Sequence, residues 1–227
     1  VTGKTIQKQQ SASEEIWSMY PSGGNRILLG CTKNLDVYDC NADTITHIDP
    51  GTFPVPQLVY RIFAAGENRI ICVASNGIYE LDNTCRIRDY FGKNAKAKAH
   101  QLPFETINDL HIDRQGVYWF ATAQDGLFRW DRTRNTFTHY GIDEGFLTAK
   151  LCRIEAAGPG ILWISTDFGL ARFDKESGRA KTYTTAEGLH HNEFNSSSSF
   201  KDASGNLWFG TIDGCVYFNP EDLPGKT

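Results

Sequence analysis

The chain has 227 residues, of which 40% are hydrophobic and 22% are charged, and its formal net charge is −4. This length allows one sizeable core or two smaller ones. The mild acidity gives no reason to expect nucleic acid or an anionic membrane surface as a partner. No segment approaches the roughly 18 consecutive apolar residues of a membrane-spanning helix. The polar run that follows Val1 carries no signal-peptide pattern, so we expect a mature chain or a part of a longer one.

Residues 3–9 come first in the chain, and their sequence, GKTIQKQ, resembles the segment GRAKTYT at residues 178–184. The later segment is expected to be the fourth strand of a repeat. The last repeat in the chain supplies only three strands before Pro220. We therefore expect residues 3–9 to act as a closing strand for that repeat, because an open edge strand is a liability.

Short runs of Val, Ile, Phe, Tyr and Trp follow, separated by glycines, and they predict β-strands joined by tight turns. These runs recur as five imperfect repeats. A period of about 40–50 residues that is rich in strands is typical of the four-stranded blades of a β-propeller. The sequence therefore predicts an all-β fold: a β-propeller, or a segment of one, with about five four-stranded antiparallel blades. Residues 1–227 are expected to form one unit, with repeats near 16–50, 59–91, 107–140, 151–183 and 195–223.

The last three repeats are anchored by Trp119, Trp163 and Trp208, which are 44 and 45 residues apart. Leu28 and Ile71 take the same place in the first two repeats. Each anchor sits in a continuous apolar run, which predicts a strand buried on both faces. We therefore interpret the tryptophans as packing between blades rather than as a platform for sugars. The glycines that follow this strand are also expected to be structural; they are Gly126, Gly169 and Gly214.

The pattern I-x-x-I/L-x-x-D-x-x-G-x-L/Y-W-x-x-T-x-x-G-L-x-R-x-D, best matched by Ile107–Asp131 and Leu151–Asp174, resembles the two-component regulator propeller repeat. This repeat builds the extracytoplasmic sensor region of hybrid two-component histidine kinases of the Bacteroides type. Glu187–Leu223 resembles the closing blade of the second propeller in those sensors. The resemblance implies that this chain is a piece of a larger sensor. Family propellers usually have seven blades and come in pairs, whereas five repeats are present here.

The resemblance also implies a function. It indicates a non-catalytic, periplasmic propeller that responds to an oligosaccharide and passes the signal to a cytoplasmic kinase absent from this chain. Expected partners are the other sensor domains of the same protein and a second copy in a homodimer.

No motif in the sequence predicts catalysis. A nucleophile elbow, a Walker-type phosphate loop and the H-E-x-x-H pattern are all missing. His190 and its neighbours His191, Asn192 and Glu193 have metal-ligand chemistry, but adjacent side chains on an extended loop point apart. We expect no catalytic residue, no metal and no cofactor. Two alternatives stay open: a propeller-type lyase or glycosidase, and a structural scaffold whose only task is dimerisation.

A ligand or partner is expected on the face that carries the long loops between repeats, because propellers concentrate variable loops there. These loops lie near residues 91–106, 141–150 and 184–194, next to the start of the following repeat. The candidate binding residues are Tyr60, Arg61, Asn108, Lys150, Arg153, His190, Asn192 and Asn195.

Overall fold

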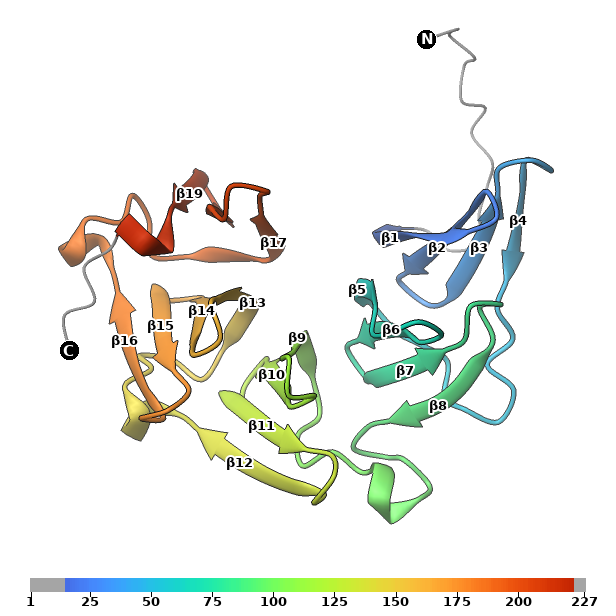
Figure 1. The fold of residues 1–227 in the computed structure, drawn as a ribbon, viewed down its shortest axis with the longest axis horizontal. Helices are drawn as coiled ribbons and strands as arrows, with labels where there is room; N and C mark the ends of the chain where they lie inside the picture. The colour runs from blue at the N-terminus through green and yellow to red at the C-terminus, as the bar shows by residue number, and fades with distance from the viewer. Residues whose placement is uncertain (1–14, 223–227) are drawn as a thin grey trace, which may run out of the picture. The chain divides into compact units, whose positions relative to one another are not determined.

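The computed structural model describes residues 15–222, so the closing strand expected at residues 3–9 lies outside the described residues. The described part forms five separate antiparallel sheets (Figure 1). In every sheet the strands are paired in the order in which they occur along the chain, which is the topology of a propeller blade. The predicted fold class, an all-β propeller with five blades, is thus confirmed. The chain divides into two compact units, one ending at Phe91 and the other beginning at Gly92.

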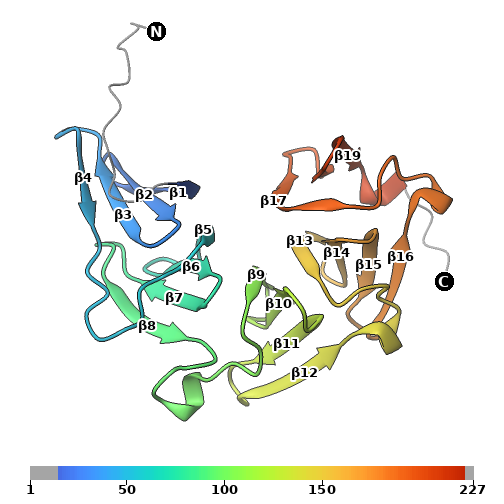
Figure 2. The ribbon, with the colours of Figure 1, turned by 180° about the vertical axis from the view of Figure 1, so that it is seen from behind.

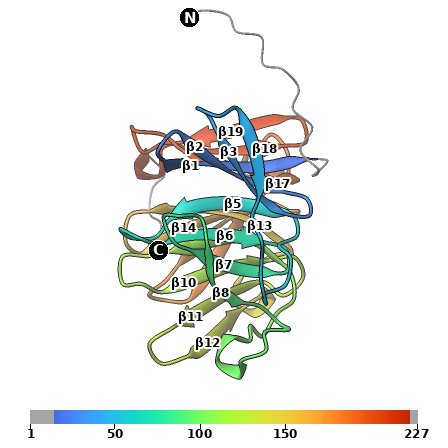
Figure 3. The same cartoon turned by 90° about the vertical axis from the view of Figure 1, so that its right-hand side faces the viewer.

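The first unit contains two blades of four strands, stacked one on the other through β1, β2 and β5 (Figure 3). Blade one comprises β1 (Ile16–Gly23), β2 (Arg26–Cys31), β3 (Leu35–Asp39) and β4 (Thr44–His47). Blade two comprises β5 (Val59–Ala64), β6 (Ile70–Ala74), β7 (Gly77–Leu81) and β8 (Ile87–Phe91).

The second unit contains two blades of four strands and a last blade of three described strands. Blade three comprises β9 (Ile107–Ile112), β10 (Tyr118–Thr122), β11 (Leu127–Asp131) and β12 (Thr136–Tyr140). Blade four comprises β13 (Leu151–Ala157), β14 (Ile161–Thr166), β15 (Leu170–Asp174) and β16 (Arg179–Tyr183). Blade five comprises β17 (Phe194–Lys201), β18 (Leu207–Thr211) and β19 (Gly214–Phe218). Short 3-10 turns are η1 (Lys98–His100), η2 (Ile142–Glu144), η3 (Thr185–Glu187) and η4 (Pro220–Asp222).

Within the second unit the first strands of the three blades, β9, β13 and β17, lie side by side (Figure 2). The second strands carry the core, as the apolar runs predicted. Every residue of β6 and of β10 is buried, whereas β18 alternates between buried and half-buried residues. These strands have no solvent-exposed residue, so they show no polar alternation.

Aromatic side chains fill the space between the blades of the second unit. Trp119 is 2% exposed and packs with Phe146 and Phe173 between blades three and four. Trp163 is also 2% exposed and packs with Phe209 between blades four and five. Burying such side chains supplies most of the driving force for stacking blades.

The turn between the second and third strands depends on glycine. Gly126 has a φ of +76°, and a Cβ on it would lie 2.6 Å from the carbonyl oxygen of Tyr140 in the fourth strand. Gly214 has a φ of +130° in the three-stranded last blade, where nothing lies within 4 Å of a Cβ. Both conformations favour glycine, but of these two positions Gly126 is the one that also lacks room for a side chain.

All six cysteines are free thiols; Cys40 and Cys215 are exposed, and the other four are buried. In the part of the chain that the structure describes, no helix is long and apolar enough to cross a membrane.

Candidate functional site

Each blade has two ends with different chemistry. At one end, which we call the loop face, the turn from the second to the third strand meets the loop leading into the next blade. Backbone hydrogen bonds join the two, as from Gly126 N–H to the Ala149 carbonyl at 2.9 Å and from Gly169 N–H to the Asn192 carbonyl at 2.7 Å. The opposite end, which we call the turn face, carries the turns from first to second and from third to fourth strands. From the sequence, the candidate binding residues were expected to lie at the loop face.

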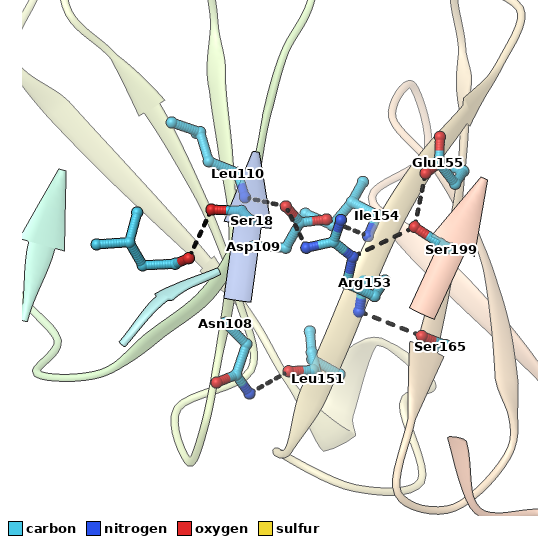
Figure 4. A network of polar contacts seen from close by, with 11 residues as sticks. Ser18, Asn108, Asp109, Leu110, Leu151, Arg153, Ile154, Glu155, Ser165 and Ser199 are labelled. Carbon is cyan, nitrogen blue, oxygen red and sulfur yellow. Dashed lines mark hydrogen bonds and ion pairs between the residues drawn. The ribbon is translucent and has the colours of Figure 1, made fainter. Parts of the chain in front are cut away.

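Asn108 is a structural link between blades. It is 7% exposed, and its Nδ2 donates to the carbonyl of Leu151 at 2.7 Å (Figure 4). Leu151 is the first residue of β13. Ser18 in the first unit makes the same kind of contact, because its Oγ donates to the carbonyl of Val59, the first residue of β5, at 2.7 Å. The side chain of Asn108 is therefore occupied by holding the next blade.

Arg153 also lies inside the second unit rather than on its surface. Its Nη1 is 3.5 Å from Oδ1 of Asp109, a fully buried carboxylate, and its Nε donates to Oγ of Ser199 at 3.3 Å. Ser199 in turn donates to Glu155 Oε1 at 2.6 Å. Asp109 also accepts the backbone N–H of Ile154 at 2.8 Å, so the network joins the first strands of all three blades (Figure 4). Buried charges require such partners.

The four remaining candidate residues in the second unit differ in whether their side chains make hydrogen bonds within the protein or extend into solvent. Asn192 accepts the Thr185 N–H through Oδ1 at 2.7 Å, and this holds its own loop. Asn195 is exposed, and its Nδ2 donates to the Thr211 carbonyl at 2.8 Å. His190 is exposed and lies 3.6 Å from Asp213, while Lys150 is exposed at the start of β13. Of these four, Lys150 and His190 are the side chains that present their charged or titratable ends to solvent.

The first unit contains an aromatic pair that the sequence analysis did not single out. Trp17 in β1 is 42% exposed, and its ring lies edge to face with that of Tyr60 at a centroid distance of 6.0 Å. Trp17 Nε1 donates to Thr32 Oγ1 at 3.1 Å, which fixes the indole. Burial raises the pKa of the Tyr60 hydroxyl. Arg61 follows Tyr60, with its guanidinium 5.8 Å from the ring centre of Phe63. Tyr60 is thus brought together with Trp17 near the loop face, whereas the printed contact of Arg61 is with Phe63.

A groove of about 690 Å³ lies elsewhere in the first unit, between the outer strand of blade one and the β7–β8 turn of blade two. His47 lines it, and His47 Nδ1 is 2.6 Å from Oδ1 of Asp36, which is fully buried. Two cations, Arg26 and Arg86, also line the groove, as does Asp49. A buried carboxylate that holds an accessible imidazole in one orientation is an arrangement that general bases also use.

The comparisons with known proteins bear on the fold. No family model matches the chain. No curated protein matches it either. Solved structures do match, and one is the extracellular domain of a hybrid two-component system from B. thetaiotaomicron, with a TM-score of 0.73 and 21% identity over 96% of this chain and 30% of that one. Another such domain from the same organism gives a TM-score of 0.67 and 19% identity over 92% of this chain and 28% of that one.

Virginiamycin B lyase from Staphylococcus aureus is also similar, with a TM-score of 0.57 and 13% identity over 90% of this chain and 69% of the lyase. The chain spans less than a third of the two sensor domains it matches. At these identities the likeness is one of fold, that of a β-propeller. The resemblance read from the repeats points to the same group of proteins.

The side chains on the loop face determine which ligands this face can bind. Within residues 15–222, no group of three or more His, Cys, Asp and Glu side chains is arranged to hold a metal ion. Glu193 N–H donates to His191 Nδ1 at 3.0 Å, which occupies one nitrogen of the loop that the sequence singled out for metal-ligand residue types. What the described loop face offers is an aromatic pair and exposed polar side chains.

Proposed function

We propose that this chain is part of the ligand-sensing region of a two-component sensor histidine kinase, outside the cytoplasm and without catalytic activity of its own. The fold supports the proposal, because sensor domains of two-component systems are among its structural neighbours. The ligand is an oligosaccharide that binds at the loop face. The signal passes through other domains of the same protein, in a homodimer, to a kinase outside this chain. The location is the periplasm.

The observation that carries the proposal is the pairing of Trp17 with Tyr60. An exposed indole that a hydrogen bond holds in place offers a flat apolar face, and sugar rings present flat C–H faces to such surfaces. The pair lies on first strands, where the rigid scaffold sets its geometry.

Calorimetric titration of the full chain with a panel of oligosaccharides tests this proposal. Trp17→Ala and Tyr60→Ala should each weaken binding of the saccharide that binds by about fivefold or more, since a stacked aromatic contact is worth about 1–3 kcal/mol. Tyr217→Ala is the matched control: Tyr217 is 62% exposed and stacks on Trp208 at 4.5 Å, toward the turn-face end of β19. Unchanged affinity in the first two variants, or equal loss in the control, contradicts the proposal.

The enzymatic alternative has one specific observation in its favour, the Asp36–His47 pair in the groove of the first unit. If the chain were a lyase or glycosidase, His47 would be the group to move a proton. Incubation of the full chain with the same oligosaccharides, followed by product analysis, tests it. Turnover that disappears in His47→Ala but persists in the Trp17→Ala variant would replace the sensor proposal with the enzymatic one.

A further inference from the structure

Two blades of the second unit contain the same carboxylate–tryptophan contact at the turn face. In blade three, Trp119 Nε1 donates to Asp113 Oδ2 at 3.0 Å. In blade five, Trp208 Nε1 donates to Asp202 Oδ2 at 3.0 Å. In both cases the aspartate precedes the tryptophan by six residues and lies in the turn between the first and second strands. Its other oxygen accepts the backbone N–H groups of that turn.

Blade four has the tryptophan without the carboxylate. Trp163 pairs with Glu155 across β13 and β14, just as Trp119 pairs with His111 across β9 and β10. The residue two positions after Glu155 is Ala157, which therefore stands where blade three has Asp113. Trp163 is 2% exposed, and its Nε1 is a buried donor with no hydrogen-bond partner. A buried donor without an acceptor destabilises the fold unless a group from outside the fold accepts its hydrogen bond.

A cavity of about 260 Å³ lies at this position. Trp163 and Ala157 both line it, together with Gly158, so the space where the missing carboxylate would sit is open. Because Trp119 Nε1 points to Asp113, the equivalent register points the Trp163 indole N–H toward Ala157 and into this cavity.

The walls of the cavity favour an anion. Arg172 and Lys201 line it and carry two positive charges, against the single negative charge of Glu221. Lys201 Nζ uses one of its three protons on the Ala156 carbonyl at 2.9 Å, which leaves donors for a ligand. In blade three the equivalent carboxylate also has a cation beside it, because Lys175 Nζ lies 3.1 Å from Asp113 Oδ2. Glu221 does not replace the missing group, since the indole N–H remains without an acceptor.

We infer that this cavity on the turn face of blades four and five is a binding site for a small carboxylate, which accepts the Trp163 indole N–H where Asp113 and Asp202 do so in the neighbouring blades. A carboxylate is the expected group because aspartate carboxylates accept the equivalent indole N–H in blades three and five. A free organic acid and the acidic unit of a saccharide present the same chemistry here. The site is distinct from the loop face. Evidence against it would therefore not count against the proposed binding of oligosaccharides by Trp17 and Tyr60, and the reverse also holds.

The test follows the indole N–H signals of the full chain, which has five tryptophans, in nitrogen-15 NMR spectra. Trp163→Phe assigns the signal of Trp163. Titration with sodium acetate or sodium glucuronate should shift this signal until it saturates, while glucose and sodium chloride at matched ionic strength should not. Saturation by glucuronate at a concentration at least tenfold lower than acetate identifies an acidic sugar as the preferred source. Saturation by both at similar concentrations identifies the carboxylate alone as sufficient.

Ala157→Asp is the decisive variant, because it restores the motif of the neighbouring blades. It should move the Trp163 signal in the absence of any ligand, abolish the response to acetate and glucuronate, and raise Tm. Asp113→Ala makes the reverse change and should give the Trp119 signal a response to acetate that the unmodified chain lacks. A Trp163 signal that ignores both carboxylates at 100 mM, or responds equally in Ala157→Asp, overturns the inference.

Discussion

The two units build the same blade from different side chains. In the second unit, Trp119 and Trp163 occupy the centre of the second strand, and each makes close ring contacts with aromatic neighbours, such as Trp163 with Phe218 at 4.7 Å. In the first unit, Leu28 and Ile71 occupy that position, and both are fully buried. The blade therefore requires a side chain that fills the space between neighbours and does not require an aromatic ring.

The contacts between first strands differ as well. In the first unit, Ser18 reaches the next blade through a neutral hydrogen bond. In the second unit, the equivalent bond from Asn108 is accompanied by the buried Asp109–Arg153 ion pair and its serine partners. We interpret this as a difference in the side chains that join the first strands: a neutral hydroxyl in the first unit, and an amide with a buried ion pair in the second.

The largest effect should come from Trp119→Ala, which removes a ring packed against blade four. The variant should lose about 3–5 kcal/mol of unfolding free energy, the usual cost of truncating a buried tryptophan. Hydrogen exchange by mass spectrometry should show the lost protection in blades three and four. Equal loss of protection in the first two blades would show that the units do not respond separately.

Asp109→Ala should cost about 3 kcal/mol or more, because it leaves Arg153 and the Ile154 N–H buried without their partner. Ser18→Ala, the matched change in the first unit, should cost about 1 kcal/mol, the worth of one neutral hydrogen bond. Denaturant titration of both variants measures the difference. Similar losses in the two would remove the distinction between the units.

Gly126→Ala should destabilise more than Gly214→Ala. Both positions have a positive φ, which costs a non-glycine residue about 1–2 kcal/mol. Only at Gly126 does the new Cβ also meet a carbonyl oxygen, that of Tyr140. Paired Tm measurements decide the order, and a larger loss at Gly214 would contradict it.

The smallest expected effect is a change in stability at low pH. Burial alone would raise the pKa of Asp82, but hydrogen bonds from Thr84, Arg86 and Arg88 outweigh it and lower the pKa to about 2. The folded-state pKa lies below the unfolded value of about 4, so the resulting stability is fully present above pH 4 and is lost as pH falls toward 2. Asp82→Asn keeps an acceptor and loses the charge. Its Tm should be lower than that of the unmodified chain at pH 7, with the gap closing below pH 4; a constant gap would refute the assignment.

Strand order and blade boundaries were predictable because they depend on local patterns: apolar runs, turn glycines and the spacing of Trp119, Trp163 and Trp208. The residues that join one blade to the next were not. Asn108 and Arg153 were assigned to a binding surface because polar side chains near a loop are usually exposed, whereas both are buried by partners about 45 residues away. Nothing in a single sequence marks such long-range pairs.

Two other features, Trp17 and Ala157, could be recognised in the sequence, but only weakly. Trp17 belongs to the repeat in which Leu28 stands at the anchor position. Because the repeats were compared at that position, Trp17 was not recognised as a candidate binding residue. Ala157 is visible as a departure once the repeats are superimposed on their tryptophans, since Asp113 and Asp202 occupy the equivalent place. Its meaning depends on the orphaned indole N–H, which only coordinates reveal.

Within each unit, the hydrogen bond from one first strand to the opening carbonyl of the following first strand has an evolutionary consequence. Ser18, Asn108 and, more weakly, the Cys152 thiol at 3.9 Å all contact the first residue of the next blade. In these three contacts the bond is made to a main-chain group, so it places little constraint on the side chain of the residue that accepts it. Gene duplication can therefore insert or delete whole blades while the joints are preserved, and the side chains at the blade ends are left free to diverge toward new ligands.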